Sequence, residues 1–475
     1  MAKLTIRSGP SFGLSESKPI ETVRSCLQEM NRVEEIHLAY GIRALILKEI
    51  FCDLPKSAPQ LHTLCIGSCM PYFSKNLFSI DEDFLYDTER LQRVELINCM
   101  ISWDSPLLTG LTRLTLEVED SSTENSGSSI NQFLHALQRM PALTNLRLKN
   151  SIPDDSKSPS TYPVVDLPCL RVLDIWSDVG ALTAVLGHIT FPQSAILNLT
   201  CKEKQSTQID FSNFLSVLAT KFPSSSVFRS CSLQIFKYTQ RCLIYGLEFY
   251  LWTTSIIQDH FPSSLISQSH LRLVLAWPSS ARSNCANIGK ALTYAFDAMS
   301  LPFLTHLRIS TSDYIDSPTW IKTFEKLPLL EWVSVRGYGI HAFLGALAYK
   351  TKALAAEKSK TAYRNILLPK LRYIHLDRTD FGATISAFSI SVDMLLEYLM
   401  ERCEKDAEVQ VLRLDGCYHI SSDDVARLKK NVVDVIWDGL EQEISIPYDS
   451  EEDLESDFND NDGNSLDDDD DDEGG

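Results

Sequence analysis

The sequence predicts a curved α/β solenoid of stacked strand-plus-helix repeats over residues 1–440, followed by a disordered acidic tail over residues 441–475. Three observations support this prediction. A motif of spaced leucines recurs along the chain, the segments between its copies have helical spacing of apolar residues, and negative charge is concentrated at the C-terminal end. Stacked repeats of this kind place parallel strands on a concave face and helices on a convex face.

The recurring motif is a leucine, two residues, a leucine, one residue, and a leucine or isoleucine. In a short strand the fourth and sixth positions then point to one face, and the third, fifth and seventh to the other. The first of these faces becomes a continuous apolar core only when repeats stack. The clear copies start at Leu61, Leu91, Leu111, Leu143, Leu170, Leu304, Leu330, Leu371 and Val409, and weaker copies lie at 33–38, 196–199 and 271–275.

Amphipathic segments between the copies predict helices. Residues 129–137 carry apolar side chains at helical spacing, and Ser317-Pro318 predicts a helix start in which the serine is the cap and the proline lies in the first turn. Further helices are predicted over residues 340–362 and about 391–403. Leu-Pro or Met-Pro pairs precede several copies, where proline ends a helix and tolerates strand entry.

Residues 200–300 depart from the clear motif. Short segments at 231–235, 245–252 and 270–275 alternate like strands, and residues 286–299 have the pattern of a helix. We therefore expect degenerate repeats here, with a local insertion as the alternative.

The net charge of −19 belongs mostly to the tail. Residues 449–475 contain 15 acidic and no basic residues, whereas residues 1–448 contain 48 acidic and 44 basic residues, a net charge of −4. Blocks of like charge such as the six aspartates at 467–472 repel one another and stay disordered. A nearly neutral body is not expected to bind nucleic acid, because phosphate binding needs a cationic surface.

Two copies of the motif show a family resemblance most clearly. The segments Leu91-Gln-Arg-Val-Glu-Leu-Ile-Asn-Cys99 and Val409-Gln-Val-Leu-Arg-Leu-Asp-Gly-Cys417 resemble leucine-rich repeats, with cysteine where that repeat has asparagine or cysteine. The irregular spacing and the Leu-Pro pairs are most similar to diverged fungal F-box-type proteins. The resemblance implies a leucine-rich-repeat solenoid that recognises a protein substrate, as the substrate receptor of an SCF-type ubiquitin ligase. A repeat scaffold with no ubiquitin-ligase link is the alternative.

The F-box itself, a helical module that would bind a Skp-type adaptor, is not found before the repeats. Residues 45–51 are superficially similar to part of one, but they lack the preceding Leu-Pro start and lie between two predicted strands. We interpret this segment as an ordinary repeat helix, with adaptor docking as the less favoured alternative.

Catalytic patterns are not found in the sequence. No GxSxG, HExxH or phosphate-loop motif occurs, and a calcium-like segment near Asp460 has Phe458 at the required first ligand position. The histidines are spread singly, and the cysteines form no zinc pattern. We therefore predict a non-enzyme without a metal or cofactor, and an enzyme on an unrecognised fold remains the remote alternative.

A protein partner is predicted to bind the concave face, at the third, fifth and seventh motif positions. Aromatic and arginine side chains are enriched at interface hot spots. Tryptophan and tyrosine would supply apolar contacts there, and the basic side chains would pair with acidic groups of a partner. The alternative is that these polar side chains only keep the face soluble. The predicted contact residues are Arg147, Lys149, Trp176, Arg308, Trp332, Arg336, Tyr373, His375 and Arg413.

The acidic tail is predicted mainly to aid solubility. Alternatively, it engages a basic partner or competes with a partner for Arg147, Lys149 and Arg308 on the body. No apolar run is long enough to span a bilayer, and the first residues lack the apolar core of a secretory signal. A cytoplasmic or nuclear protein without a membrane partner is therefore expected.

Overall fold

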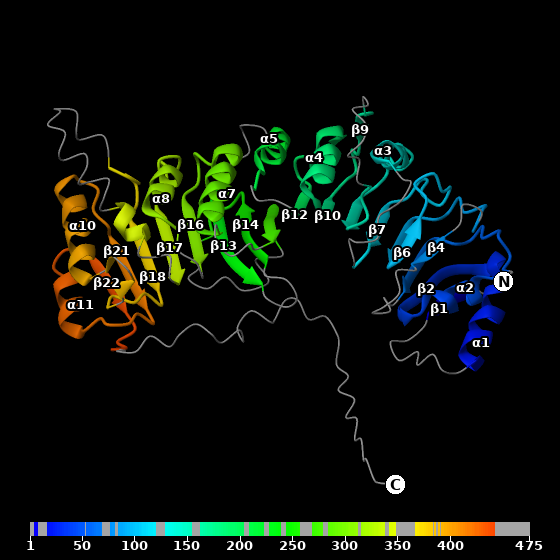
Figure 1. The fold of residues 1–475 in the computed structure, drawn as a ribbon, viewed down its shortest axis with the longest axis horizontal. Coiled ribbons are helices and arrows are strands. Elements are labelled where there is room, and N and C mark those ends of the chain that lie inside the picture. The colour runs from blue at the N-terminus through cyan, green and yellow to red at the C-terminus, as the bar shows by residue number, and fades with distance from the viewer. Residues whose placement is uncertain are drawn as a thin grey trace, which may run out of the picture.

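The protein, described in a computed structural model, has a mixed α/β architecture built around one mostly parallel β-sheet of 16 strands. The molecule is arched, with the sheet on its inner side and the helices along its outer side (Figure 1). The sheet runs from β1 to β22 without closing into a barrel. The structure describes residues 4–7, 17–52, 54–68, 77–80, 84–119, 129–153, 162–203, 209–222, 228–238, 244–256, 268–278, 284–311, 315–337, 342–347, 366–382, 384–385, 388–389 and 391–441.

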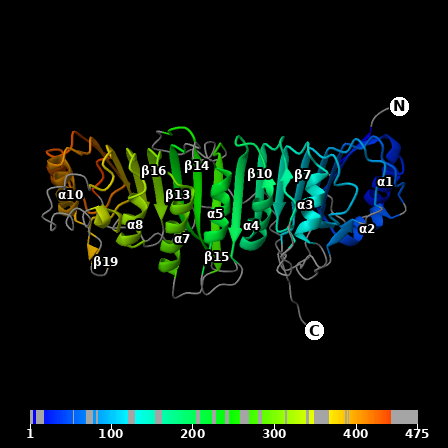
Figure 2. The ribbon, with the colours of Figure 1, turned by 90° about the horizontal axis from the view of Figure 1, so that it is seen from above.

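The strands of the large sheet lie side by side across the long axis of the molecule (Figure 2). Those of the N-terminal half are β1 (Leu4–Arg7), β2 (Val33–Ile42), β3 (Thr63–Ser68), β5 (Arg93–Ile97), β7 (Arg113–Glu117), β8 (Asn145–Lys149), β10 (Val172–Asp178) and β12 (Ile196–Lys202). The others are β13 (Ser230–Tyr238), β14 (Ile244–Trp252), β15 (Leu271–Pro278), β16 (His306–Thr311), β17 (Trp332–Gly337), β18 (Tyr373–Asp377), β21 (Val411–Asp415) and β22 (Asp434–Trp437). Every predicted strand, strong or weak, is therefore confirmed as a member of this sheet.

The helices are mostly short and lie between consecutive strands. Besides the helical residues 342–347, the helices in the described part of the chain are α1 (Ser17–Leu27), the 3-10 helix η1 (Met30–Arg32), α2 (Ala44–Phe51), α3 (Ile130–Gln138), α4 (Val179–His188), α5 (Ser212–Lys221), α7 (Asn284–Met299), α8 (Ser317–Phe324), α10 (Val392–Glu404) and α11 (Ser422–Leu428). Small two-stranded pairs join β4 (Phe78–Ile80) to β6 (Cys99–Ile101), β9 (Val165–Asp166) to β11 (Ile189–Thr190), and β19 (Thr384–Ile385) to β20 (Phe388–Ser389).

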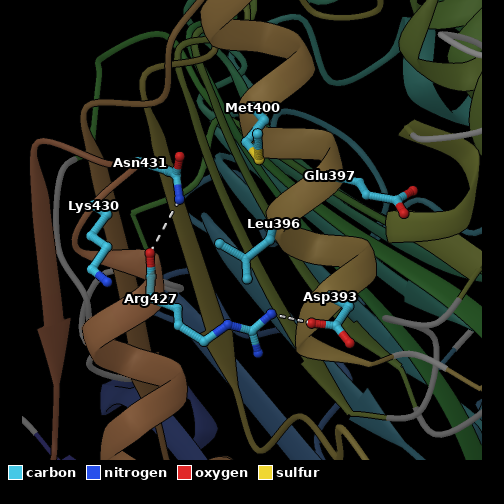
Figure 3. Close-up of a pocket in the computed structure, with 7 residues that line it drawn as sticks. All are labelled: Asp393, Leu396, Glu397, Met400, Arg427, Lys430 and Asn431. Atoms are coloured by element: carbon cyan, nitrogen blue, oxygen red, sulfur yellow. Dashed lines mark hydrogen bonds and ion pairs between the residues drawn. The ribbon is translucent and has the colours of Figure 1, made fainter.

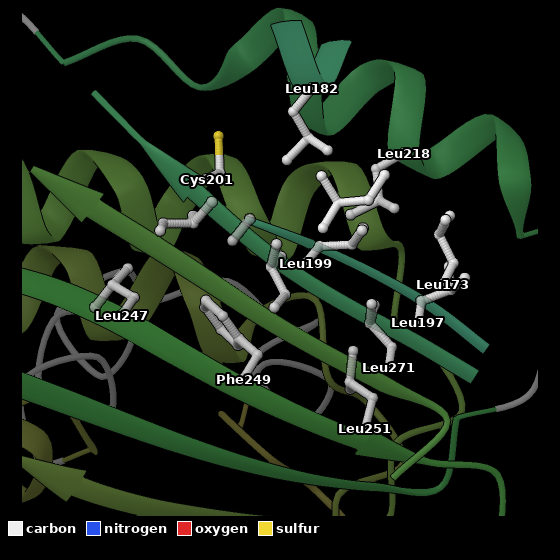
Figure 4. Packing of buried hydrophobic residues seen from close by; sticks show 14 of the residues in the cluster. Leu173, Leu182, Leu197, Leu199, Cys201, Leu218, Leu247, Phe249, Leu251 and Leu271 are labelled. Carbon is white, nitrogen blue, oxygen red and sulfur yellow. The ribbon is translucent and has the colours of Figure 1, made fainter. Parts of the chain in front are cut away.

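The core follows from the predicted alternation. Neighbouring strands pair in register, so that Leu146 of β8 stands beside Leu173 of β10, which stands beside Leu197 of β12. These fourth-position leucines are 0–1% exposed, and each contributes about 1.5–3 kcal/mol by leaving water. Leu182 of α4 and Leu218 of α5 lie on the helical side of Leu173 and Leu197 (Figure 4). In-register pairing of the strands thus buries one continuous apolar layer.

Residues 200–300 contain an inserted meander. The sheet order there is β12-β15-β14-β13-β16, and β14 runs antiparallel to both of its neighbours. The chain therefore leaves β12, returns through three adjacent strands in reverse spatial order, and resumes parallel pairing at β16. The alternative of a local insertion therefore describes this region better than a run of degenerate repeats. The elements themselves lie where they were predicted: β13, β14 and β15 at the three strand segments, and α7 at the helix segment.

Helix starts are set by side chains that accept the first free backbone amides. Ser129 and Gln132 form a reciprocal capping box at α3, as expected for the predicted helix over 129–137. At α8 the cap is Asp316, whose carboxylate accepts from the amide of Thr319 at 3.1 Å, so the prediction of Ser317 as the cap is wrong. Ser317 lies inside the helix and donates to the carbonyl of Ala342 instead.

Two predicted segments lie largely or wholly outside the described residues. Of the predicted helix over 340–362, only residues 342–347 are described, and they are helical. Residues 442–475, which include the acidic run, are outside the description.

The predicted helix over 391–403 corresponds to α10, which begins one residue after its Ser391 cap.

Asparagines close the turns at the ends of two strands. Asn98 and Asn150 have φ values of 52° and 50°, a left-handed conformation that asparagine tolerates better than most residues. The Asn98 amide donates to the carbonyl of Ser68 at 3.1 Å and its oxygen accepts from the amide of Glu119 at 2.9 Å. Each such asparagine therefore links its own turn to the turns of neighbouring strands.

Arg402 of α10 is fully buried, with 0% of its surface exposed. Its guanidinium donates to the carbonyls of Leu367 at 2.9 Å, Leu368 at 2.8 Å and Ala407 at 3.0 Å, and to the Tyr398 hydroxyl at 3.1 Å. A buried cation is tolerated only when its donors are satisfied in this way. Arg402 therefore ties α10 to the turn that leads into β18.

Replacing Arg402 with leucine should destabilise the fold strongly. The substitution leaves the carbonyls of Leu367 and Ala407 without the donors of Arg402, and the free energy of unfolding should fall by about 3 kcal/mol or more. Urea-induced unfolding followed by circular dichroism measures the change. Arg171→Leu, at an exposed position, is the control and should change stability by less than about 0.5 kcal/mol. Equal losses in both variants would contradict the role of Arg402.

Candidate protein interface

The open face of the sheet holds the side chains at the third, fifth and seventh motif positions. In-register pairing arranges them in three rows, with Arg147 beside Asp174 and Lys149 beside Trp176. All nine predicted contact residues lie on this face, in two groups separated by β12, β15, β14 and β13. The N-terminal group lies on β8 and β10, and the C-terminal group lies on β16, β17, β18 and β21.

Basic side chains of the C-terminal group pair with carboxylates of the same face. The Nε of Arg336 lies 3.6 Å from Asp377, and the Nε of Arg413 lies 2.7 Å from Asp415. Burial lowers the pKa of the Arg308 guanidinium, and the carboxylate of Asp377 opposes that shift. These arginines therefore contribute to a fixed pattern of charge, and an acidic partner would have to compete with carboxylates already present.

His375 lies in the middle of the same group and is 3% exposed. Its Nδ1 is 3.1 Å from the Ser334 hydroxyl and its Nε2 is 3.0 Å from the Asp415 carboxylate. Burial lowers the pKa of His375 below its ordinary value, although Asp415 acts in the opposite direction. His375 is therefore a buried link between strands, and a partner would not reach it without moving its neighbours.

Three neighbouring rings form one row of the C-terminal group, with Trp332 and Tyr373 stacked and His306 tilted against Trp332. The ring centres of His306 and Trp332 are 6.0 Å apart, and those of Trp332 and Tyr373 are 5.6 Å apart. Trp332 is only 5% exposed because its neighbours cover both of its faces. An alanine at Trp332 would therefore remove packing from the sheet as well as a contact surface, whereas Tyr373 is half-buried and presents more of its ring.

Arg147 is the most exposed of the predicted arginines for which an ion pair is described, with 59% of its side chain accessible. Its Nε lies 2.9 Å from Glu117 and 3.4 Å from Asp174, so it bridges β7 and β10. Burial raises the pKa of Asp174, while Arg147 opposes that shift. Surface pairs of this kind add little stability, but they fix the orientation of the charged groups.

Lys149, Trp176 and Lys202 form what we call the lysine–tryptophan cluster. The ammonium groups of Lys149 and Lys202 lie 4.9 Å and 4.3 Å from the centre of the Trp176 ring. Because β10 lies between β8 and β12, the two lysines reach the ring from the two strands that flank it. Burial lowers the pKa of Lys202, and the charge of Lys149 adds to that shift. The indole thus holds two cations close together by cation–π attraction.

Sequence reasoning missed Lys202 and a second ion pair in the meander. Lys202 ends β12 beyond the weak motif copy at 196–199, and only the length of this strand brings its side chain beside Trp176. In the meander, Arg272 lies 2.7 Å from Glu248, which also accepts a hydrogen bond of 2.7 Å from the Tyr250 hydroxyl. The alternation along residues 245–252 and 270–275 predicts which side chains share a face of the sheet. No local feature of the sequence predicts that β14 and β15 pair antiparallel.

A groove on the helical side is the other notable surface feature (Figure 3). It lies between α10 and α11, where Arg427 of α11 pairs with Asp393 of α10 across the opening. Its volume is about 540 Å³, and Met400 is 49% exposed in its wall. The groove is lined by Asp393, Leu396, Glu397, Met400, Arg427, Lys430 and Asn431. A flanking ion pair and one exposed thioether do not specify a particular ligand.

The chemically reactive side chains are dispersed or shielded in the described part of the chain. Burial raises the pKa of the Cys99 and Cys417 thiols to about 12, which makes both poor nucleophiles at neutral pH. No group of three or more histidine, cysteine or acidic side chains among the described residues is arranged to hold a metal ion. Nor does any described helix combine the length and the apolar character needed to cross a membrane.

In comparisons with known proteins, no family model matches the chain, and no curated protein is similar enough to be considered a relative. Interpretation of the open face therefore depends on its own geometry.

The low pKa of His375 makes folding stability sensitive to mild acid. An unfolded histidine binds a proton as the pH falls through about 6.5, whereas folded His375 stays neutral to lower pH, so the unfolded state binds more protons. The free energy of unfolding should therefore fall between about pH 7 and pH 5.5. The variant His375→Gln should lose less stability than the unsubstituted protein over that interval.

Urea unfolding at the two pH values measures this difference. His135→Gln, on the exposed side of α3, is the control for the loss of one imidazole. An equal pH-dependent loss in His375→Gln and in the unsubstituted protein would contradict the assignment of a neutral, buried His375.

Proposed function

We propose that this chain is a leucine-rich-repeat solenoid whose function is non-catalytic recognition of another protein on the open strand face. The observation that supports this proposal is the division of the sheet into two surfaces. Helices cover one side, and in-register rows of charged and aromatic side chains occupy the other. A long face of this kind offers a partner many contacts from a rigid support.

The pairing of charges within the face supports recognition of a specific partner. Arg147, Arg336 and Arg413 are each held by carboxylates, so their positions are set before a partner arrives. Groups that are already ordered cost little side-chain entropy when a partner binds. A fixed alternation of positive and negative charge also penalises partners whose charges do not match.

The ubiquitin-ligase role remains a proposal based on resemblance alone. It requires a helical surface for a Skp-type adaptor, and the segment most similar to one is α2. Ile46, Leu47 and Ile50 of α2 are buried in the body, while Leu45 is 76% exposed. An apolar side used for the core is not available to an adaptor, which favours a scaffold or receptor without a direct ligase link.

We also propose a cytoplasmic or nuclear location. Cys99, Cys201, Cys231 and Cys417 are buried thiols that pack as small apolar side chains. Such packing suits a compartment in which thiols stay reduced.

Site-specific photocrosslinking tests the recognition surface. A photoreactive amino acid at the exposed position of Arg113 on the strand face should capture partner proteins in living cells, because this position lies beside the proposed contact rows. The same amino acid at the exposed position of Lys290, on α7 of the helical side, is the matched control. Capture of the same proteins with equal yield at both positions would contradict the assignment of the strand face.

Mixing the purified chain with a purified Skp-type adaptor tests the ligase link. We expect the two proteins to elute separately in size-exclusion chromatography, because the apolar side of α2 is already buried. A stable complex that is lost on Leu45→Asp would instead establish adaptor docking at α2, and the substrate-receptor function would then be preferred.

A further inference from the structure

The lysine–tryptophan cluster differs from the other basic groups of the open face in its balance of charge. Arg147, Arg272, Arg336 and Arg413 each have a carboxylate within 4 Å. In the described part of the chain, no carboxylate lies within that distance of the ammonium group of Lys149 or Lys202. The two ammonium groups therefore share one indole without a carboxylate in direct contact, and the charge of Asp174 acts on Lys149 from a greater distance.

The geometry of the cluster suits a run of carboxylates. A planar arginine fork favours bidentate binding of one carboxylate or phosphate, whereas lysine ammonium groups act as separate point charges. Here the two ammonium groups come from the strands on either side of β10, so they can contact two different acidic side chains of one extended segment. The indole between them supplies an apolar surface for the backbone of that segment.

We propose that Lys149, Trp176 and Lys202 bind the acidic run at residues 467–473 of this same chain. The run comprises Asp467 to Asp472 followed by Glu473, which is seven consecutive carboxylates. A bound tail would cover the open face at β8, β10 and β12, and a partner that binds there would have to displace it. Competition between the tail and a partner rests on the proposed function, whereas binding of the tail to the cluster does not.

The acidic run is attached at a suitable place and distance. When the pairing is followed from strand to strand, Trp437 of β22 aligns with Ile175, the residue before Trp176. The chain therefore leaves β22 at the level of the C-terminal end of β10, where the cluster lies. Nine strand-to-strand steps separate β10 from β22, about 43 Å along the sheet at about 4.8 Å a step. From residue 441 to residue 467 there are 26 residues, which span about 28 Å as a random coil and about 86 Å when extended.

The charges near the start of the tail favour binding at a distance. Asp377, Asp415, Asp434 and Asp438 lie on β18, β21 and β22 or directly after them. The arginines of that end are paired with two of these aspartates, Arg336 with Asp377 and Arg413 with Asp415. On the open face an acidic segment would therefore meet carboxylates near its attachment point, and the lysine–tryptophan cluster is a positive site farther along the same face.

Intramolecular photocrosslinking in the full chain tests the contact. A photoreactive amino acid at Thr200, the register partner of Trp176, should form crosslinks to the segment 449–475 at about 50 mM NaCl, located by mass spectrometry of the digested protein. At about 500 mM NaCl the yield should fall at least about five-fold, because salt screens exposed charges. The double substitution Lys149→Gln and Lys202→Gln should cause a similar loss.

The matched control replaces Lys290 and Lys322 of the helical side with glutamine, and it should leave the crosslinks unchanged. Circular dichroism confirms that both double variants are folded. Absence of crosslinks to the tail at low salt, or equal yields with and without Lys149 and Lys202, would overturn the proposal.

A binding experiment then identifies the occupant. The probe is a fluorescent peptide with the sequence of residues 464–475, and the two proteins are the full chain and a full chain with asparagine at positions 467–472. The peptide should bind the asparagine variant at least about five-fold more tightly, because a tethered competitor acts at millimolar effective concentration. Equal affinity for both chains would show that the site takes acidic segments of other proteins, and would overturn the intramolecular assignment. Neither result depends on the strand face capturing a cellular partner, so failure of the proposed function would be seen separately.

Discussion

In-register pairing of neighbouring strands is the constraint on which the rest of this structure depends. Side chains alternate between the faces of a strand, so a shift of one residue in any pairing would place leucines in solvent and charged groups in the core. Leu146, Leu173 and Leu197 lie in one buried row because β8, β10 and β12 share the same register. The same register sets Lys149 beside Trp176 on the opposite face. Stability and the candidate interface therefore come from one arrangement.

The inserted meander keeps its strands in register although its connections differ from those of the rest of the sheet. β14 runs against the direction of the other strands, yet Leu247 and Phe249 still lie in rows with Leu275 and Leu273 of β15. The apolar layer continues through the insertion because alternation does not depend on strand direction. On the open face the insertion brings Glu248, Arg272 and Tyr250 together between the two groups of predicted contact residues.

The net charge of this protein does not describe how charge is distributed along the chain and over its open face. The body is nearly neutral, and several arginines of the open face are matched by carboxylates on the same strand or on an adjacent strand. Such matching orders the charged side chains and limits the surfaces that bind anions strongly. A small cluster of unmatched cations then has more influence on binding than the total charge would suggest.

The sequence by itself determined the strands, the face to which each side chain points, and the starts of α3 and α10, because these depend on local spacing and on caps within a few residues. It also placed all nine predicted contact residues on one face of one sheet. Only the tertiary structure decided which of them are accessible. Trp332 and His375 are covered by side chains from adjacent strands, and Lys202 reaches Trp176 from the neighbouring strand β12. The reversed order of β13, β14 and β15 was likewise beyond the sequence, because strand order depends on contacts between segments far apart in the chain.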